Sequence, residues 1–355
     1  MAIILITAGL VTLTVGAELL VKGASGLARS IGIPALIVGL TVVAFGTSAP
    51  ELAVSMKAVL SGQADIALGN VVGSNIFNVL FILGVSALVI PLSVSSQLVR
   101  FDVPVMICVS LLAWLFAADG VIMRLEGALL VAGLAVYTTL LIRMGMKPLP
   151  PSDRNLHGST PKTPKRITVN AVLVLFGLVL LIIGARWLVS GAVDLAVFLG
   201  VSELMIGLTI VAAGTSLPEL ATSFVAVIRK ERDIAVGNVV GSNIFNILAI
   251  LGTSAMVSGD VGVAPGALHF DVPVMTAVAV ACLPIFFTGG RISRWEGAVF
   301  VVYYIVYIAY LVLAASMHEN ADSFNRTMLW FVLPATMLGI LISLLHGLRA
   351  HRSRS

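Results

Sequence analysis

Two short segments of the chain join acidic and hydroxyl side chains to residues that open a helix. They read GTSAPE at 46–51 and GTSLPE at 214–219. Proline has no backbone N–H and clashes with the carbonyl one turn before it, so a helix opens there and leaves carbonyl groups without partners. Carboxylate, carbonyl and amide oxygens are the ligands that hard cations such as Ca²⁺ take. The two segments therefore predict a cation site.

The ligands predicted from these segments are two carboxylates, four hydroxyl groups and two backbone carbonyls. The side chains are those of Glu51, Glu219, Thr47, Ser48, Thr215 and Ser216, and the carbonyls are those of Ala44 and Ala212.

A ten-residue motif, GNVVGSNIFN, occurs twice, at 69–78 and 237–246. Asn70, Ser74 and Asn78 are four residues apart, so they share one face of a helix, and the second copy repeats this face. Oxygen atoms on the two faces complete the predicted site. They belong to Ser74, Asn78, Ser242 and Asn246.

The remaining polar residues of the motif have other predicted roles. Asn75 and Asn243 point about 100° away from the ligand face, so we expect them to form hydrogen bonds behind the ligands. The glycines of the motif predict close packing of helices.

The elements that must position these residues are membrane helices. The chain is 59% hydrophobic and only 11% charged, whereas soluble domains carry about 25% charged residues. Roughly 20 apolar residues cross the hydrocarbon core as a helix, and the alternation typical of a β-barrel is missing. Eleven stretches qualify: 2–21, 34–60, 67–91, 102–118, 124–143, 167–189, 203–228, 234–257, 271–288, 295–315 and 327–348.

A membrane setting strengthens the prediction of a cation site. One carboxylate at the middle of a bilayer costs about 2.5–3.5 kcal/mol on insertion scales. A single glutamate could be accommodated as a neutral acid that hydrogen-bonds between helices. Glu51 and Glu219 occupy identical helix-breaking contexts, which favours a bound cation or proton over two such isolated acids.

The chain is also an internal repeat. GAELLVKGA at 16–24 resembles GARWLVSGA at 184–192, and FDVPVM occurs at 101–106 and at 270–275. Residues 1–143 and 167–315 are therefore two copies of a five-helix unit. Since five is odd, the second copy enters the membrane from the opposite side, which is the inverted-topology plan of many secondary transporters. The predicted fold is an all-α polytopic membrane protein with ten core helices.

Two segments lie outside the repeats. Residues 144–166 predict a short basic cytoplasmic linker, and residues 316–355 predict one extra C-terminal membrane helix and a basic tail. The net charge of +4 fits the positive-inside rule rather than a nucleic-acid partner. The distribution of Lys and Arg among the loops predicts an N-terminus outside the plasma (inner) membrane and a cytoplasmic C-terminus.

Some charged residues receive structural predictions. Asp102 and Asp271 precede Val-Pro at the start of a span, which is typical of an N-cap. Glu18 aligns with Arg186 in the repeat, and because opposite charges cannot serve as the same ligand, we leave both out of the site.

The duplicated GTSAPE/GTSLPE and GNVVGSNIFN motifs resemble the repeat signature of the sodium/calcium exchanger family, and the resemblance covers residues 1–315. It implies a prokaryotic-type member that exchanges Ca²⁺ for Na⁺ by alternating access, is not an enzyme and needs no cofactor. The glutamates would be central ligands, with the Thr and Ser hydroxyls and the Ala44 and Ala212 carbonyls at flanking Na⁺ sites. Several relatives carry an acid at one or both of the positions where Asn78 and Asn246 stand here.

The two amides leave the coupling ion open. One Ca²⁺ balances two carboxylates, and so do two Na⁺. Exchange of Ca²⁺ for H⁺, or for another monovalent cation such as K⁺, remains the alternative. A channel usually needs a pore formed by several subunits, and an intramembrane protease needs a motif such as HExxH, which this sequence lacks.

Overall fold

The computed structural model describes residues 1–146, 164–201, 206, 210, 212–287 and 290–316. The first half contains helices and π-helical segments (η) with these bounds: α1 Ala2–Ile31, α2 Ala35–Val38, η1 Gly39–Val43, α3 Ala44–Thr47, α4 Ala49–Leu60, α5 Ala64–Ile76, η2 Phe77–Leu83, α6 Gly84–Val89, η3 Leu98–Asp102, α7 Val103–Ala117 and α8 Arg124–Gly145.

The second half repeats this order. Its helical segments are α10 Pro164–Phe198, α12 Ala212–Gly214, α13 Leu217–Ile228, α14 Arg232–Phe245, η5 Asn246–Leu251, α15 Gly252–Ser258, η6 Ala267–Asp271, α16 Val272–Phe287 and α17 Arg294–Ser316. Four short strands lie between helices: β1 Leu92–Ser93, β2 Val121–Met123, β3 Asp260–Gly262 and β4 Arg291–Ile292.

The predicted class of all-α membrane protein is confirmed. Within the described residues, eight helices are long and apolar enough to cross a membrane: Ala2–Ile31, Ala64–Val89, Leu98–Ala117, Arg124–Gly145, Pro164–Phe198, Arg232–Ser258, Ala267–Phe287 and Arg294–Leu313. The helices Ala35–Thr47 and Ala49–Leu60 pass the same test together and meet at a bend of 42°, so they count as a ninth span if the pair is one broken span rather than a re-entrant loop. The bend falls inside GTSAPE, as its Gly and Pro predict.

Two predicted spans, 203–228 and 327–348, lie partly or wholly outside the described residues. The first part of 203–228 lies largely outside the described residues, and Leu217–Ile228 forms a shorter apolar helix. The predicted extra helix at 327–348, and most of the predicted linker, lie outside the described residues.

The two halves contact each other crosswise. Strand β1 pairs with β4 and β2 pairs with β3, both antiparallel. In the same way, α6 packs on α17 and α15 packs on α8. A Cβ added at Gly127 would lie 2.6 Å from the Gly252 carbonyl oxygen, and one at Gly297 would lie 2.7 Å from that of Gly84. Equivalent elements therefore exchange partners, as a two-fold relation between the halves requires.

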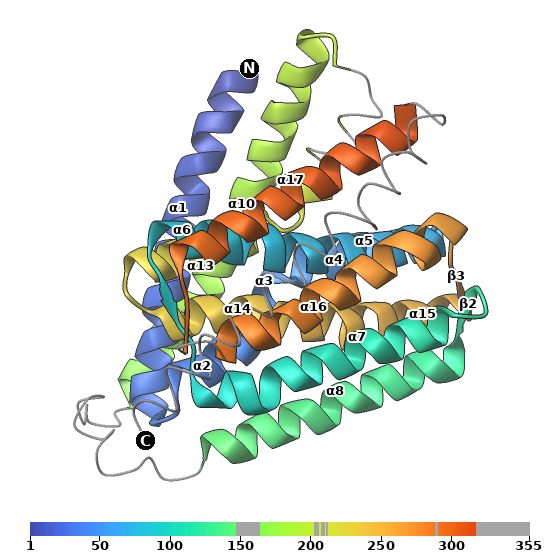
Figure 1. Ribbon diagram of the computed structural model, residues 1–355. Coiled ribbons are helices and arrows are strands. Elements are labelled where there is room, and N and C mark those ends of the chain that lie inside the picture. The colour runs from blue at the N-terminus through green and yellow to red at the C-terminus, as the bar shows by residue number, and fades with distance from the viewer. Residues whose placement is uncertain (147–163, 202–205, 207–209, 211, 288–289, 317–355) are drawn as a thin grey trace.

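Helices α1 and α10 form an antiparallel pair that crosses the other helices steeply and extends beyond them at the N-terminal end of α1 (Figure 1). Small residues let their backbones approach closely. A Cβ at Gly16 would lie 2.9 Å from the Gly177 carbonyl oxygen, and one at Gly9 would lie 2.9 Å from that of Gly184. No larger side chain fits at these crossings without displacing a backbone.

This pair of helices packs unequally on the two halves. Helix α1 lies along α13, whereas α10 makes few contacts with α4, the repeat-related helix. Two ion pairs tie α1 to the turn after α13. The Arg229 guanidinium donates to the Glu18 carboxylate, with 3.2 Å from Nε to Oε1, and Arg29 Nη1 lies 3.4 Å from Glu231 Oε1.

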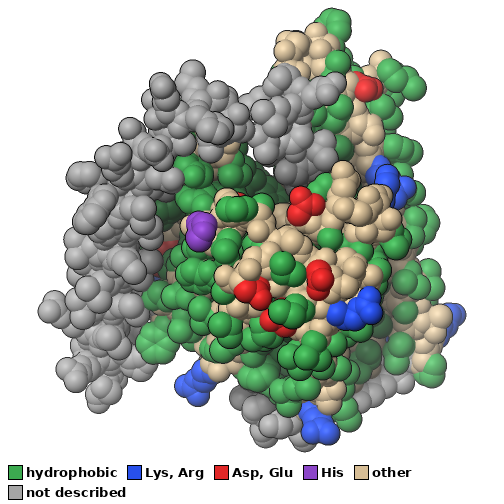
Figure 2. Space-filling model, turned by 90° about the vertical axis from the view of Figure 1, so that its right-hand side faces the viewer, with side chains coloured by type: hydrophobic (Ala, Val, Ile, Leu, Met, Phe, Trp, Pro, Cys, Tyr) green, Lys and Arg blue, Asp and Glu red, His purple; other side chains and the backbone are tan. Residues whose placement is uncertain are grey.

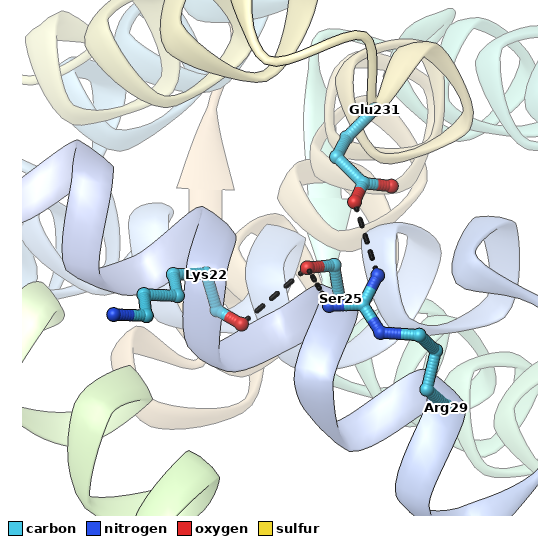
Figure 3. A network of polar contacts seen from close by, with 4 residues as sticks. All are labelled: Lys22, Ser25, Arg29 and Glu231. Atoms are coloured by element: carbon cyan, nitrogen blue, oxygen red, sulfur yellow. Dashed lines mark hydrogen bonds and ion pairs between the residues drawn. The ribbon is translucent and has the colours of Figure 1, made fainter. Parts of the chain in front are cut away.

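The second ion pair belongs to a small polar network (Figure 3). Arg29 Nη2 donates to Ser25 Oγ at 3.2 Å, and Ser25 Oγ donates to the Lys22 carbonyl oxygen at 3.4 Å. The arginine is thus held at both ends of its guanidinium, on its own helix and on the turn after α13.

The end of the molecule that carries β2 and β3 has acidic side chains among hydrophobic ones (Figure 2). Asp260 lies in β3, opposite Met123 of β2. Asp119 accepts a hydrogen bond from the Val121 N–H at 3.1 Å, and Glu126 accepts one from the Met123 N–H at 2.8 Å. These acids fasten the turns at that end.

The predicted N-caps at Asp102 and Asp271 are wrong. The helix continues through both positions, because η3 precedes α7 and η6 precedes α16, so neither residue meets a free helix start. Asp102 instead accepts hydrogen bonds from Tyr137 at 3.1 Å and from Gln97 at 3.2 Å. Asp271 accepts one from the Tyr307 hydroxyl at 2.9 Å. Each acid therefore joins two neighbouring membrane helices.

Candidate ion-binding site

The two glutamates lie at the starts of α4 and α13, just after the break that each proline makes. Glu51 and Glu219 occupy the first turns of these helices, where the positive end of the helix dipole favours a negative charge. Each residue is only 1% exposed. The helix-breaking segments therefore place both carboxylates inside the protein.

Each glutamate is held by a serine from the opposite half. Ser48 Oγ donates to Glu219 Oε1 at 2.9 Å, and Ser216 Oγ donates to Glu51 Oε1 at 2.9 Å. Ser216 Oγ also lies 3.2 Å from Ser74 Oγ. These crosswise bonds bring the two GTSxPE segments and the first GNVVGSNIFN motif together.

The second oxygen of each carboxylate has no hydrogen-bond partner among the described residues. Glu51 Oε2 and Glu219 Oε2 are both buried in this state. A buried carboxylate oxygen without a partner is costly, and a bound cation removes that cost by direct contact. Ser48 and Ser216 bond only Oε1 of their carboxylates, so Oε2 of each glutamate stays available for such a contact.

The amides of Asn78 and Asn246 show the same pattern. Asn78 Nδ2 donates to Asn243 Oδ1 and Asn246 Nδ2 donates to Asn75 Oδ1, both at 3.0 Å. The Oδ1 atoms of Asn78 and Asn246 are buried and, in the described part of the chain, have no partner. The nitrogen of each amide is used, and its oxygen is left free.

The hydroxyl groups of the predicted site divide into two sets. Thr215 Oγ1 and Ser242 Oγ are buried without a partner within the described residues. Thr47 Oγ1 instead donates within 3.1 Å to both the Val43 carbonyl oxygen and Asn238 Oδ1. Thr47 and Thr215, which occupy equivalent positions in the repeat, therefore differ in their hydrogen bonds.

The carbonyl at Ala44 differs from the expectation. It accepts the helical hydrogen bond from the Ser48 N–H at 3.0 Å and lies 3.4 Å from Thr47 Oγ1. The expectation that the break frees this carbonyl is wrong, because Pro50 removes the N–H that would reach Gly46 rather than Ala44. Its role as an ion ligand, like that of the carbonyl at Ala212 in α12, stays a prediction.

Two asparagines support the glutamates from behind, in roles that the sequence analysis missed. Asn70 Nδ2 donates to the Glu51 carbonyl oxygen at 3.1 Å and to Ser55 Oγ at 2.9 Å. In the other half, Asn238 Nδ2 donates to the Glu219 carbonyl oxygen at 3.4 Å and to Ser223 Oγ at 3.0 Å. The available signal was the repetition of serine four residues after each glutamate, at positions 55 and 223.

The glycines of the second motif pack closely, as predicted. A Cβ at Gly237 would lie 2.9 Å from the Leu36 carbonyl oxygen, and one at Gly241 would lie 2.7 Å from that of Leu40. For Gly69 and Gly73 the close packing is not found among the described residues, where an added Cβ would meet nothing within 4 Å; the segment equivalent to α2 and η1 lies largely outside the described residues.

The chemistry of the site suits a hard cation. Its buried atoms without partners in the described residues are all oxygens: Glu51 Oε2, Glu219 Oε2, Asn78 Oδ1, Asn246 Oδ1, Thr215 Oγ1 and Ser242 Oγ. Carboxylate and amide oxygens are the ligands of Ca²⁺. No group of three or more His, Cys, Asp or Glu side chains in the described ranges could hold a metal ion.

Comparisons with known proteins agree with this chemistry. The family model described as "Sodium/calcium exchanger protein" matches residues 1–143 and 169–313. The chain is 36% identical to the inner membrane protein YrbG of Escherichia coli over 79% of this chain and 87% of that protein. It is 34% identical to the sodium/calcium exchanger MaX1 of Methanosarcina acetivorans over 85% and 96% of the two chains.

A solved structure shows the same fold. The sodium-calcium exchanger NCX_Mj, soaked with Na⁺ and Sr²⁺, superposes with a TM-score of 0.76 at 29% identity, over 87% of this chain and 97% of that chain. The family moves ions and uses no cofactor. The chain therefore belongs to the sodium/calcium exchanger family and is an integral membrane cation/Ca²⁺ exchanger rather than an enzyme, as its duplicated motifs predicted.

Proposed function

We propose that this protein exchanges Ca²⁺ for Na⁺ by alternating access, with both ions using the site around Glu51 and Glu219. One observation carries the proposal: six buried oxygen atoms of the predicted ligands, from both halves, lack partners among the described residues, and two of them belong to carboxylates. A site of this kind is poorly satisfied when empty and well satisfied by a cation.

The charge of the site supports exchange of these two ions. Glu51 and Glu219 are the acids of the site, and the amides Asn78 and Asn246 add oxygen without charge. One Ca²⁺ or two Na⁺ therefore neutralise the carboxylates. Relatives named as sodium/calcium exchangers, MaX1 and NCX_Mj, support Na⁺ as the coupling ion.

The arrangement of the halves supports alternating access. The antiparallel α1–α10 pair and the crosswise strands fit two repeats of inverted topology. In this arrangement α1 packs along α13, while α10 makes few contacts with α4. Since the halves are similar in sequence, we infer a second arrangement in which α10 packs along α4, and the two arrangements would expose the site to opposite sides of the membrane.

A second coupling ion deserves its own test. Glu51 Oε2 and Glu219 Oε2 are buried and unpartnered within the described residues, and a proton on either carboxylate would relieve the cost of an empty site. This observation favours Ca²⁺/H⁺ exchange as the alternative, and K⁺ is a further monovalent candidate.

Flux in proteoliposomes separates these functions. Vesicles loaded with Na⁺ are diluted into Na⁺-free medium with labelled Ca²⁺, beside vesicles loaded with K⁺ and vesicles with a pH gradient alone. We expect Ca²⁺ uptake that requires internal Na⁺. Uptake driven only by the pH gradient or only by K⁺ would overturn Na⁺ coupling, and no uptake under any gradient would overturn the proposed antiport.

We also propose an orientation with the N-terminus outside and the C-terminus in the cytoplasm of the inner membrane. The distribution of Lys and Arg among the loops supports this direction. The strand pairs β1–β4 and β2–β3 fit the alternation of loops between the two sides, and the relative YrbG is named an inner membrane protein.

A further inference from the structure

Two asparagines next to the proposed ion ligands tie the halves together. Asn75 and Asn243 are 2% and 3% exposed. Asn75 Nδ2 donates to the Asn243 carbonyl oxygen, and Asn243 Nδ2 donates to the Asn75 carbonyl oxygen, both at 3.2 Å. Asn75 Nδ2 also lies 3.6 Å from Met275 Sδ. The side-chain nitrogens of this pair are therefore committed to the backbone of the opposite half.

Their side-chain oxygens serve a different purpose. Asn75 Oδ1 accepts a hydrogen bond from Asn246 Nδ2, and Asn243 Oδ1 accepts one from Asn78 Nδ2, both at 3.0 Å. We call the four residues Asn75, Asn78, Asn243 and Asn246 the amide square. Within it, each ligand amide is held by its nitrogen end alone.

An amide has donors at one end and an acceptor at the other. Because Asn75 and Asn243 take the nitrogen ends of Asn246 and Asn78, the oxygen ends must point away from them. Both Oδ1 atoms are buried, and neither has a partner within the described residues. A ligand amide turned by 180° would instead present N–H groups, which repel a cation.

We propose that Asn75 and Asn243 are positioning residues that set the orientation of the ligand amides, so that the site is built for amides at positions 78 and 246. The proposal rests on the proposed ion site. It assigns to the amide square the selection of neutral ligands at positions 78 and 246.

The square also predicts that a carboxylate fits poorly at position 246. A carboxylate has two acceptor ends, so one of its oxygens would face the acceptor Asn75 Oδ1 at about the 3.0 Å that now separates the two side chains. Asn75 cannot turn its amide to donate without losing its bond to the Asn243 carbonyl. Removing the Asn75 side chain removes this conflict, and a carboxylate needs no orienting partner because both its ends are oxygen.

Equilibrium binding of labelled Ca²⁺ to the purified full-length protein tests this reasoning. We expect Asn75→Ala to weaken Ca²⁺ binding by up to about tenfold, the scale of one lost hydrogen bond between neutral groups. We expect Asn246→Asp to bind Ca²⁺ at least tenfold more tightly in the Asn75→Ala background than in the presence of Asn75. A purely structural role for Asn75 would not reverse the order of these variants.

The other half supplies the matched control. Asn243 orients Asn78 rather than Asn246, so Asn243→Ala should improve the binding of Asn78→Asp and should not improve that of Asn246→Asp. The mirrored pair also keeps the test available if Asn75→Ala does not fold, as judged by size-exclusion chromatography.

The outcomes separate the two proposals. If the wild-type protein does not bind Ca²⁺, the proposed function fails. If the wild type binds Ca²⁺ but the folded Asn75→Ala and Asn243→Ala variants bind it as tightly as the wild type, the positioning role fails while the ion site stands. The same holds if Asn75→Ala and Asn243→Ala change the Ca²⁺ affinity of Asn246→Asp equally.

Discussion

At the scale of single residues, each glutamate of the proposed site depends on the other half of the chain. Ser216 holds Glu51 and Ser48 holds Glu219, and both serines bond to Oε1 so that Oε2 stays available. The motifs were enough to predict the ligand types, because Gly, Pro and Glu recur in the same order. They could not show which oxygen is free, since that depends on contacts between residues 165 or 171 positions apart.

We expect Glu51→Gln and Glu219→Gln each to abolish Ca²⁺ transport, because each removes half of the negative charge of the site and replaces an acceptor oxygen by a donor nitrogen. Labelled Ca²⁺ uptake into Na⁺-loaded proteoliposomes measures the effect. Glu126→Gln is the control, since Glu126 caps the start of α8 at the Met123 N–H. Wild-type uptake in either glutamine variant would remove that glutamate from the site.

At the scale of the elements, the fold was largely predictable, and its unequal packing was not. Long apolar stretches mark membrane helices because lipid demands them, and Gly46 with Pro50 marks the break in the Ala35–Leu60 span. The two copies are too similar in sequence to reveal that α1 packs along α13 while α10 makes few contacts with α4.

The ion pairs of α1 offer a sequence difference that matches the unequal packing. Glu18 and Arg29 reach Arg229 and Glu231 of the turn after α13. The equivalent turn after α4 reads Ser61, Gly62 and Gln63 and carries no charge. The two ion pairs, Glu18–Arg229 and Arg29–Glu231, can therefore form on one half only.

We expect the double variant Arg29→Gln/Arg229→Gln to loosen α1 from α13. Exposed ion pairs contribute about 0.2–1 kcal/mol each, so together they shift a two-state population by about fivefold. Hydrogen exchange of the backbone amides of residues 229–234 should accelerate accordingly, with Arg100→Gln in η3 as the control. Unchanged hydrogen exchange in the double variant would show that the two ion pairs do not stabilise the packing of α1 on α13.

At the scale of the whole molecule, the proposed orientation assigns each loop to one side of the membrane. The loop at 61–63 should face outside and the loop at 94–97, between β1 and η3, should face the cytoplasm. Both loops contain an exposed serine, Ser61 and Ser96.

Cysteine labelling in intact cells tests this assignment. In a background with Cys108 and Cys282 replaced by alanine, Ser61→Cys should react with a membrane-impermeant maleimide added outside, and Ser96→Cys should react only after the cells are opened. The reverse pattern would place the N-terminus in the cytoplasm.

The crosswise bonds also set an order of events when the chain is made. Proteins fold as they are synthesised, N-terminal part first, but Glu51 finds its serine 165 residues later, and β1 finds β4 only when residue 291 has emerged. The Glu51 carboxylate therefore lacks its serine partner until the second half of the chain has been synthesised and inserted. If the halves are inverted repeats, a single half expressed alone can satisfy the same contacts only with another copy of itself inserted in the opposite direction.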